Sequence, residues 1–392
     1  METVNKNPKN FSSQFQGPVK GFKDYIGEEA DKFSFIREIA RQTFEKYNFQ
    51  EVQTPIIEYE KFVKGENPND EAVSDVFKLN DRGKRDLALR YEFTFQLKRI
   101  AENQKLPFKR FQIGSVFRDE PVQGNRLRQF TQCDIDTIGA TVKDQAEILS
   151  AVRDILQALK VKSILYVNNR ELLNQILDES KIKEKEEVIR EIDKLDKLSY
   201  QEVKSNLKKY NAEAILEIFN KPEGYFERYP AYQEIKELKE TCKLYGFEIK
   251  FQPSLARGLS YYTGNVFEIK SDIKETICGG GTYRIGETIA SGISFSIERL
   301  MAVTNVLINL EKFLLVSLNQ DKKAIQLSKQ LRKQGKNTSL YFGKPNKALA
   351  YANAYQFTKV IFVGEKEVEK KKFKVKNLQT GKEVTLTLTK AK

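Results

Sequence analysis

The chain has 392 residues, which suggests roughly two or three domains, each able to bury its own core. Charged residues make up 31% and hydrophobic residues 40% of the sequence, a balance typical of a folded protein. It contains no histidine, which excludes catalytic dyads and triads that need an imidazole, and histidine-ligated metals. Its three cysteines are far apart, so neither a disulfide framework nor a CxxC zinc site is predicted.

No stretch of the sequence approaches the ~20 apolar residues that a membrane span needs. Residues 1–20 are polar, and we expect a disordered leader there rather than a secretory signal. Widely spaced cysteines fit a reducing compartment. Together these features predict a cytoplasmic protein with no membrane partner.

The net charge of +13 is concentrated at one end of the chain. Residues 309–392 contain 19 Lys and Arg against 6 Asp and Glu, whereas residues 1–308 are balanced. Such an asymmetry favours a nucleic-acid partner for the C-terminal segment. The alternative is a lysine-rich solvated surface, and composition alone does not separate the two.

The N-terminal part mixes predicted helices and strands. Residues 27–48 carry apolar side chains at helical spacing after an acidic start, which favours a helix. Residues 49–58 are predicted as a strand, in which Pro55 favours an edge or an interface. The next predicted elements are a strand, a helix and a hairpin with a long polar loop, at residues 87–90, 92–103, 110–118 and 129–139.

The charge density rises over residues 165–245, which we predict to be an inserted helical domain between two parts of a catalytic-type α+β domain, residues 21–164 and 246–308. Strands are expected again at residues 248–252, 261–270 and 275–278. Strands then alternate with helices, which predicts a small α/β domain over residues 309–392. Its strands are expected at 313–318, 339–342, 359–364, 373–377 and 383–388, and its helices at 322–334 and 345–354.

The loop of the hairpin is rich in arginine. Arg118, Arg126 and Arg128 lie close together in sequence around Glu120, and guanidinium groups suit polyphosphates and carboxylates. Glu120 could accept a hydrogen bond from an amino group, and Phe130 could stack on a base. By the period of two in a strand, one face of the second strand carries Gln132, Asp134 and Asp136. The alternative is an exposed hairpin whose charges pair with one another.

A second segment places Arg257 shortly before the pair Tyr261 and Tyr262. Adjacent side chains of a strand point to opposite faces, so we expect one tyrosine in a pocket and the other on the opposite side. The alternative is a core strand with tyrosine in place of phenylalanine.

A third segment combines a glycine run, residues 279–281, with Arg299 at the start of an expected helix. Glycines at the end of a strand allow the backbone to approach a ligand closely. The alternative is a turn followed by a Glu298–Arg299 ion pair. The sequence has no P-loop and no dinucleotide fingerprint.

In their order and spacing these segments resemble the class II aminoacyl-tRNA synthetases, and among them the histidyl-tRNA synthetases. The resemblance is carried by a dimer-interface motif, a second motif, a third motif and a segment similar to the family's RGLDYYTGTVFE, at residues 27–58, 116–136, 292–300 and 257–267. It implies an α+β catalytic domain on an antiparallel sheet, a helical insertion and a C-terminal α/β anticodon-binding domain.

The resemblance also implies roles for individual side chains. Arg118 and Arg257 would be catalytic, at the reacting α-phosphate. ATP would be bound by Arg118, Glu120, Arg126, Phe130 and Arg299. Histidine would be bound by Glu92, Thr94, Gln132, Asp136, Tyr261, Tyr262 and Tyr283. No side chain is expected to ligate a metal, and Mg²⁺ would bridge the ATP phosphates. The chain departs from the family pattern at Asp136, Ser260, Thr282, Arg284 and Ser296.

The implied function is the ATP-dependent ligation of L-histidine to tRNA(His) through histidyl-adenylate, by a homodimer. One alternative is the histidine-sensing regulatory subunit of ATP phosphoribosyltransferase, a catalytically inactive relative that typically lacks the C-terminal domain and the full arginine set. Another alternative is a synthetase-like nucleic-acid-binding module. Histidine-dependent ATP–pyrophosphate exchange separates the enzyme from both.

Overall fold

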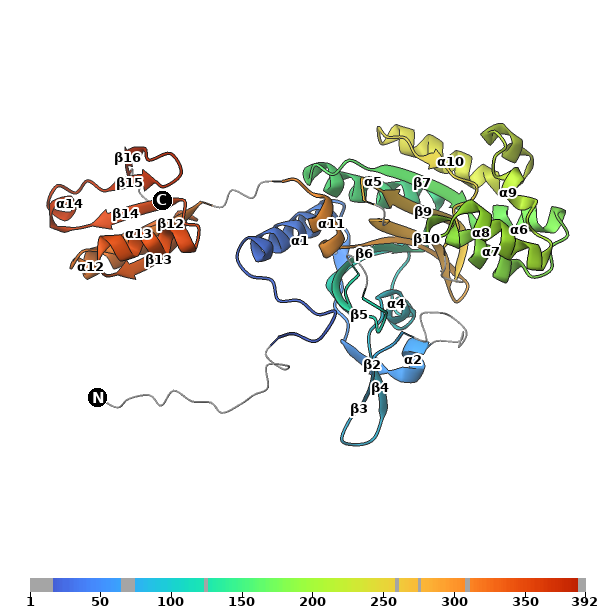
Figure 1. The fold of residues 1–392 in the computed structure, drawn as a ribbon, viewed down its shortest axis with the longest axis horizontal. Coiled ribbons are helices and arrows are strands. Elements are labelled where there is room, and N and C mark those ends of the chain that lie inside the picture. The colour runs from blue at the N-terminus through green and yellow to red at the C-terminus, as the bar shows by residue number, and fades with distance from the viewer. Residues whose placement is uncertain are drawn as a thin grey trace. The chain divides into compact units, whose positions relative to one another are not determined.

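The computed structural model describes residues 17–64, 75–122, 126–257, 261–273, 276–306 and 311–386. Contacts divide the chain into two compact units, Met1–Val306 and Leu307–Lys392 (Figure 1). Most of the predicted leader, residues 1–16, lies outside the described residues. Within the described ranges, no helix is both long enough and apolar enough to cross a membrane.

The first unit is built on an eight-stranded sheet. Its strands, in spatial order, are β1 (Gln50–Glu51), β5 (Phe108–Phe117), β6 (Gln129–Ile138), β11 (Thr288–Ser296), β10 (Cys278–Ile285), β9 (Tyr262–Lys270), β7 (Ile164–Asn169) and β8 (Lys250–Phe251). Only the edge pairs, β1 with β5 and β7 with β8, are parallel, and the strands between pair antiparallel. The predicted antiparallel α+β fold is confirmed.

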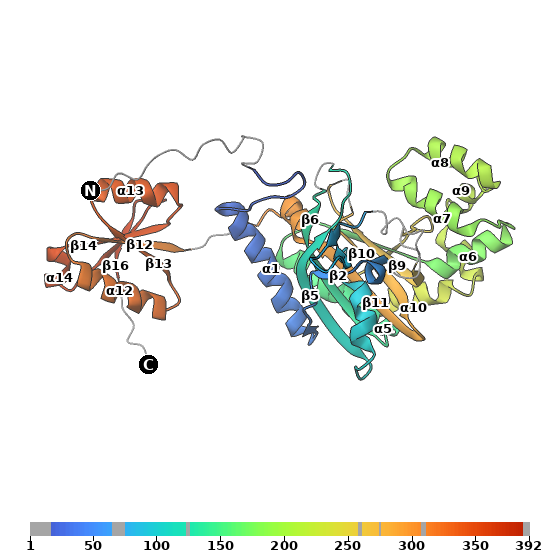
Figure 2. The ribbon, with the colours of Figure 1, turned by 90° about the horizontal axis from the view of Figure 1, so that it is seen from below.

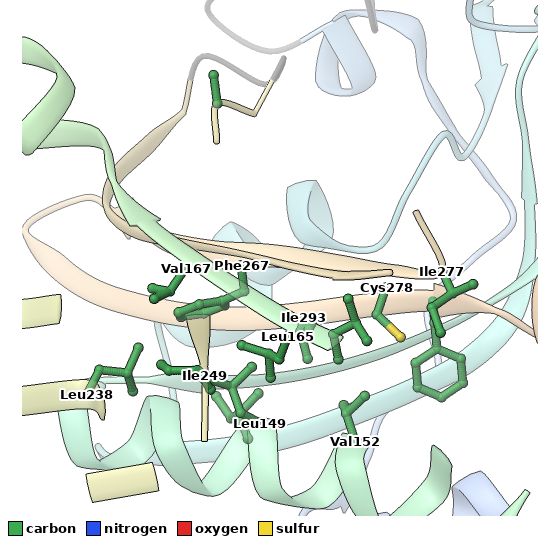
Figure 3. Packing of buried hydrophobic residues seen from close by; sticks show 14 of the residues in the cluster. Leu149, Val152, Leu165, Val167, Leu238, Ile249, Phe267, Ile277, Cys278 and Ile293 are labelled. Carbon is green, nitrogen blue, oxygen red and sulfur yellow. The ribbon is translucent and has the colours of Figure 1, made fainter. Parts of the chain in front are cut away.

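One face of this sheet is apolar and packs on α1 (Glu28–Lys46) and α5 (Val142–Ala158). The Phe44 ring of α1 lies 5.3 Å from that of Phe111 in β5. Figure 3 shows Leu149 and Val152 of α5 facing the strands. Since side chains alternate along a strand, the residues between these core positions point to the opposite, polar face, where the candidate site lies.

A small three-stranded sheet of β2 (Ile57–Tyr59), β4 (Asp86–Leu89) and β3 (Lys78–Asn80) accompanies α2 (Glu60–Lys64) and α4 (Thr94–Ala101). The prediction of one strand over residues 49–58 is wrong, because β1 and β2 belong to different sheets and Pro55 lies between them. Proline has no N–H group to donate to a neighbouring strand, so the ladder stops there.

The charged middle of the chain is helical from Arg170 onward. Its elements are α6 (Arg170–Glu179), α7 (Lys185–Asp193), η2 (Lys194–Asp196), α8 (Tyr200–Leu207), η3 (Lys208–Tyr210), α9 (Ile215–Ile218), η4 (Glu223–Arg228) and α10 (Tyr232–Leu244). The predicted helical start at residue 165 is wrong, because Leu165 and Val167 are buried in β7 of the main sheet. Residues 170–245, the helical segment, share the main core. Its status as a separate domain stays a prediction.

The glycine run was expected to follow a strand, but it lies inside β10, and β11 beside it was not predicted as a strand. Glycine has low strand propensity and contributes nothing to an alternating pattern, which explains the error in β10. Strand β11 contains one glycine and ends in the alternating sequence ISFS, which was interpreted as the approach to a helix. The expected helix after β11 is α11 (Ile297–Val303).

The second unit is an α/β domain, as predicted. Its sheet has the order β13 (Asn337–Phe342), β12 (Lys312–Ser317), β14 (Lys359–Val363), β15 (Lys374–Asn377) and β16 (Glu383–Thr385), with the first three strands parallel. Leu327 of α12 (Asp321–Lys333) and Ala348 of α13 (Pro345–Ala354) belong to separate core clusters on the two faces (Figure 2). The short helix α14 (Glu365–Glu369) was not predicted.

Candidate active site

A cavity lies on the polar face of the main sheet. Most of the predicted site residues line it: Glu92, Thr94, Arg118, Phe130, Gln132, Asp136, Arg257, Tyr261, Tyr262, Tyr283 and Arg299. Two predicted ATP-binding residues, Glu120 and Arg126, are not among its lining residues. Tyr91, Asp134 and Thr276 also line the cavity but had been assigned no role.

The acidic part of the cavity is formed by Asp134 and Asp136 on β6, opposite Arg110 on β5. Arg110 is fully buried, and its Nη2 lies 2.7 Å from Asp136 Oδ2 and 3.9 Å from Asp134 Oδ2. Burial raises the pKa of Asp134 to about 8, although Arg110 lowers it, and burial also raises the pKa of Asp136. The Gln132 amide donates a 2.7 Å hydrogen bond to Asp134.

Arg110 was not predicted as a site residue, although a signal for it exists. It lies in the strand paired with β6, and the register places it directly across from Asp136. A charged side chain in a strand buried on both faces requires an opposite charge beside it. Loop length fixes that register, and the hairpin loop here was too long for its geometry to be read from sequence.

Three tyrosines form the wall next to these carboxylates. The Tyr283 hydroxyl donates a 2.6 Å hydrogen bond to Asp136 Oδ1. The Tyr261 ring lies 4.7 Å from that of Tyr262 and 5.8 Å from that of Tyr283, measured between centroids. Burial raises the pKa of all three phenols, so they stay protonated and can donate hydrogen bonds.

The expectation that Tyr261 and Tyr262 point to opposite sides is wrong, since both line the cavity. Strand β9 begins at Tyr262, so Tyr261 precedes the strand and escapes its alternation. The Tyr261 hydroxyl reaches Glu92, donating to Oε2 at 3.4 Å. The alternative reading of this segment as a plain core strand therefore fails for both tyrosines.

The glycines make room for the site's own side chains. A Cβ atom at Gly279 would lie 2.6 Å from both terminal nitrogens of Arg257, and one at Gly292 would lie 1.9 Å from Asp136 Oδ1. A Cβ at Gly281 would lie 2.8 Å from the Tyr262 ring. Real Cβ contacts are not this short, so a larger residue would displace these groups. Gly279 and Gly280 also line the cavity, so the close approach of this backbone to a ligand stays a prediction.

Arginines form the other part of the cavity wall. The guanidinium carbon of Arg118 lies over two aromatic rings, 4.4 Å from the centroid of Tyr91 and 5.1 Å from that of Phe130. Glu120 lies 3.9 Å from Arg118 and 2.9 Å from Arg126. Charges of the hairpin loop therefore pair with one another, as the alternative for this loop proposed, while Arg118 still faces the cavity.

Arg257 and Arg299 complete the cationic wall. Arg257 Nη1 donates a 2.7 Å hydrogen bond to Glu268, and Arg299 Nη1 donates a 2.6 Å hydrogen bond to the Thr276 carbonyl. The alternative Glu298–Arg299 ion pair does not form in the described chain, because Glu298 accepts instead from the Thr131 backbone N–H at 2.9 and 3.1 Å.

Of the described departures from the family pattern, Asp136 and Ser296 reach the cavity. Ser296 lines it and caps α11, because its hydroxyl accepts a 3.1 Å hydrogen bond from the backbone N–H of Arg299. Thr282 accepts instead from Gln145 of α5, and Arg284 is exposed. Ser260 lies outside the described residues. The substitutions at 282 and 284 therefore leave the cavity wall unchanged.

The cavity thus combines two kinds of wall on one sheet. One kind is acidic and aromatic and suits a ligand with N–H donors. The other is cationic and suits phosphates or a carboxylate. The strand register places Asp136 beside Gly292 and places Gln132, four residues earlier in β6, beside Ser296, so a ligand can contact both kinds of wall at once.

Comparisons with known proteins agree with this geometry. Residues 21–300 match the family model described as histidyl-tRNA synthetase, and residues 306–392 match the anticodon binding domain. The histidine–tRNA ligase 1 of Bacillus anthracis is 31% identical, over 95% of this chain and 97% of that protein. The histidine–tRNA ligase 2 of Shouchella clausii is also 31% identical, over 93% and 96%.

Two solved structures share the fold. The histidyl-tRNA synthetase from Nostoc sp. PCC 7120 has a TM-score of 0.82 at 23% identity, covering 96% of this chain and 97% of its own. A Bacillus halodurans protein described as an ATP phosphoribosyltransferase regulatory subunit/histidyl-tRNA synthetase has a TM-score of 0.74 at 19% identity, covering 89% and 98%.

Proposed function

This chain belongs to the histidyl-tRNA synthetase family, and on that premise we propose that it is an active histidine–tRNA ligase. The observation that carries the proposal is that Arg118, Arg257 and Arg299 line the same cavity as Asp136 and its tyrosine partners. A ligand with an imidazole, a carboxylate and a neighbouring polyphosphate would satisfy both kinds of wall.

The acidic and aromatic wall would bind histidine. Asp136 Oδ2 is buried and forms an ion pair with Arg110 Nη2 at 2.7 Å, and the second lone pair of this carboxylate oxygen could accept an imidazole N–H. Gln132 and Tyr262 would complete the imidazole pocket, while Tyr283 would hold Asp136. Glu92, with Thr94, would receive the α-amino group, and Tyr261 would position Glu92.

The cationic wall would bind ATP and activate it. A histidine carboxylate oxygen attacks the α-phosphorus, and the bond from that phosphorus to the bridging oxygen breaks as pyrophosphate leaves. Arg118 and Arg257 would stabilise the negative charge that develops, as preorganised donors do. Arg126 and Arg299 would hold the γ-phosphate. Phe130 would stack on adenine and Glu120 would accept from its amino group.

No general base is needed for this first step, because the nucleophile is already a carboxylate. A protein without histidine can therefore catalyse it. In the second step a hydroxyl at the 3′-end of tRNA(His) attacks the carbonyl carbon of histidyl-adenylate, and AMP leaves.

Magnesium would accompany ATP as its phosphate-bound ion. Among the described residues, no group of three or more His, Cys, Asp or Glu side chains could hold a metal. The oxygen ligands would therefore come mainly from the phosphates and water, an arrangement that Mg²⁺ favours. The ion would neutralise phosphate charge next to Arg299.

The second unit would bind the anticodon region of tRNA(His). Residues 337–364 contain no Asp or Glu, and Lys344 and Lys347 are exposed. Beside them, the rings of Tyr351 and Tyr355 lie 4.6 Å apart, and Tyr355 is 62% exposed. Exposed aromatic rings next to lysines, in a stretch of sequence without acidic residues, suit unpaired bases and their phosphates.

We also propose a homodimer in the cytoplasm. Ile56, Ile57 and Tyr59 are each about half exposed next to the segment that resembles the dimer-interface motif, and a second copy would cover them. The three cysteines Cys133, Cys242 and Cys278 are buried free thiols, which supports a reducing compartment.

A regulatory role is the second candidate function, because the Bacillus halodurans neighbour is described as a regulatory subunit as well as a synthetase. The present chain carries three arginines in its cavity and a C-terminal unit that matches the anticodon binding domain, and both features favour the enzyme. Histidine-dependent exchange of pyrophosphate into ATP tests the choice. Exchange that requires L-histidine would support the ligase proposal. If the folded protein showed no exchange, the ligase proposal would be rejected.

A further inference from the structure

We propose that Glu268 is a positioning residue that holds Arg257 and Arg299 in place, and that Lys270 and Asp196 tie this assembly to the helical segment. The inference rests on the proposed function, because it concerns how two of the proposed ATP-binding and catalytic arginines are oriented. None of these three positioning residues belongs to the set expected from the sequence.

Glu268 joins the two arginines through a single carboxylate. It lies on β9 and is 4% exposed. Its Oε1 accepts the 2.7 Å hydrogen bond from Arg257, and its Oε2 accepts a 3.1 Å hydrogen bond from the Thr276 hydroxyl. The carbonyl of the same Thr276 accepts from Arg299 at 2.6 Å. Displacing Glu268 therefore loosens one arginine directly and the other through one residue.

Arg257 depends on this contact because its backbone is not in a helix or strand. Glu268 pairs with Gly279 across β9 and β10, and the missing side chain at Gly279 leaves the space for the guanidinium group. The group is thus held against the sheet by one buried carboxylate. Guanidinium has five N–H donors, so a bond at Nη1 orients it and leaves other donors for a phosphate.

The ionic chain continues outward to the helical segment. Lys270 Nζ lies 3.6 Å from Glu268 Oε2 and 2.8 Å from Asp196 Oδ1, in η2. Charge alternates along Arg257, Glu268, Lys270 and Asp196. Burial also raises the pKa of Asp193, at the end of α7, to about 6, while Arg257 and Lys197 lower it.

Through this arrangement, a movement of the helical segment can change the position of Arg257 at the reacting phosphate. A shift of η2 relative to β9 would move Lys270 and, through Glu268, the guanidinium of Arg257. Misplacing a reacting group by ~1 Å can lower a rate by about 100-fold. The proposed imidazole acceptors Asp136 and Gln132 lie on β6, outside this chain of contacts, so the affinity for histidine should change less than kcat.

The main test is a double-mutant cycle between Glu268→Ala and Arg257→Ala, read by histidine-dependent ATP–pyrophosphate exchange. We expect Glu268→Ala to lower kcat by about 100-fold, with the KM for histidine changed by less than about twofold. The double variant should be only slightly slower than Arg257→Ala alone, because Glu268 acts mainly through Arg257 and affects Arg299 only through Thr276. Glu268→Gln, which keeps an oxygen acceptor, should recover about tenfold of the loss. Additive losses, or a parallel rise in the KM for histidine, would overturn the proposal.

The outer link has its own test and a matched control. Asp196→Ala should lower kcat by about threefold to tenfold, which a partly exposed pair allows. Asp178→Ala breaks a similar ion pair of the helical segment, with Lys185 at 2.6 Å, and should leave kcat unchanged. These exposed substitutions also serve if Glu268→Ala does not fold. Equal effects of Asp196→Ala and Asp178→Ala would overturn the link.

A failure of the proposed function would look different. If wild-type protein showed no exchange, the ligase proposal would fail. The affinity of each variant of the double-mutant cycle for MgATP would then be measured by calorimetry instead. Non-additive affinities for Glu268→Ala and Arg257→Ala would still support the positioning role. Additive affinities, or an unchanged affinity for Glu268→Ala, would overturn it.

Discussion

The Tyr283 hydroxyl donates a 2.6 Å hydrogen bond to Asp136 Oδ1 across the intervening strand β11, where Gly292 leaves the space that the pair occupies. Asp136 is also held by the fully buried Arg110. The orientation of the proposed imidazole acceptor therefore depends on one phenol and one guanidinium.

Removing the phenol should weaken histidine binding selectively. We expect Tyr283→Phe to raise the KM for histidine about tenfold, because a hydrogen bond to a charged group contributes about 1.5–3 kcal/mol. The KM for ATP should stay within about twofold. Steady-state exchange at varied histidine and ATP measures both constants, with Tyr200→Phe, on the exposed surface of α8, as control. An equal rise in both KM values would contradict this assignment.

The buried carboxyl pair predicts a pH-dependent stability. Since the folded-state pKa of Asp134 is raised from its ordinary value to about 8, its neutral form stabilises the fold at low pH, and that contribution is lost as the pH rises toward 8. Asp134→Asn removes the titration and keeps an oxygen for Gln132. The Tm of this variant minus that of wild type should rise by about 3 °C or more between pH 5 and 8 and be flat above.

Thermal unfolding followed by circular dichroism at several pH values measures that difference. Glu38→Gln, on the exposed surface of α1, provides a control at a carboxyl whose pKa is lowered, not raised. Its Tm difference should not rise over pH 5–8. A pH-independent difference for Asp134→Asn would show that this carboxyl ionises in the folded protein as it does in the unfolded chain.

The glycine at 279 predicts a variant that keeps its fold and loses activity. A Cβ atom at this position meets the flexible end of Arg257, whereas one at Gly280 meets the backbone of Gly292 at 2.1 Å. We therefore expect Gly279→Ala to lower exchange by about 100-fold while the free energy of unfolding falls by less than about 1 kcal/mol. Gly280→Ala should lower stability much more. Denaturant unfolding beside the exchange assay distinguishes them, and wild-type activity in Gly279→Ala would refute the close contact.

Much of the fold could be predicted because its signals are local. The hairpin at residues 110–118 and 129–139 corresponds to β5 and β6, since alternating strands around a polar loop need no tertiary information. The glycine run could not be placed in a strand, because glycine has no side chain to show a period. The break at Pro55 was visible, but which sheet each half joins depends on long-range pairing.

The sequence predicted which residues line the site better than it predicted which residues contact one another there. The family resemblance supplied Arg257 and Tyr283, and both line the cavity. The partners that orient them, Glu268 and Arg110, were assigned no role from the sequence, although Glu268 directly follows the family-like segment 257–267, and the strand register brings both beside the site. Tyr261 was placed wrongly because a strand boundary shifted by one residue reverses a side chain's direction.

The second unit predicts a localised RNA contact. Lys344→Ala with Lys347→Ala should weaken binding of tRNA(His) and reduce the slope of log affinity against log salt by up to about two, because each phosphate contact contributes about one. Exchange without tRNA should not change. The control pair Lys322→Ala with Lys323→Ala, on exposed α12, removes the same charge elsewhere on the unit. Equal losses in both pairs, measured by filter binding over a salt series, would mean that net charge alone governs binding.

The central claim is that this chain ligates histidine to tRNA. The most direct measurement is the transfer of radiolabelled L-histidine to tRNA(His), with ATP and Mg²⁺, by wild type and by folded Arg257→Ala. We predict ATP-dependent charging by wild type and a loss of about 100-fold to 1,000-fold for Arg257→Ala, as expected when one preorganised donor at the reacting phosphate is removed. Absence of charging by wild type, or equal charging by Arg257→Ala, would contradict the account.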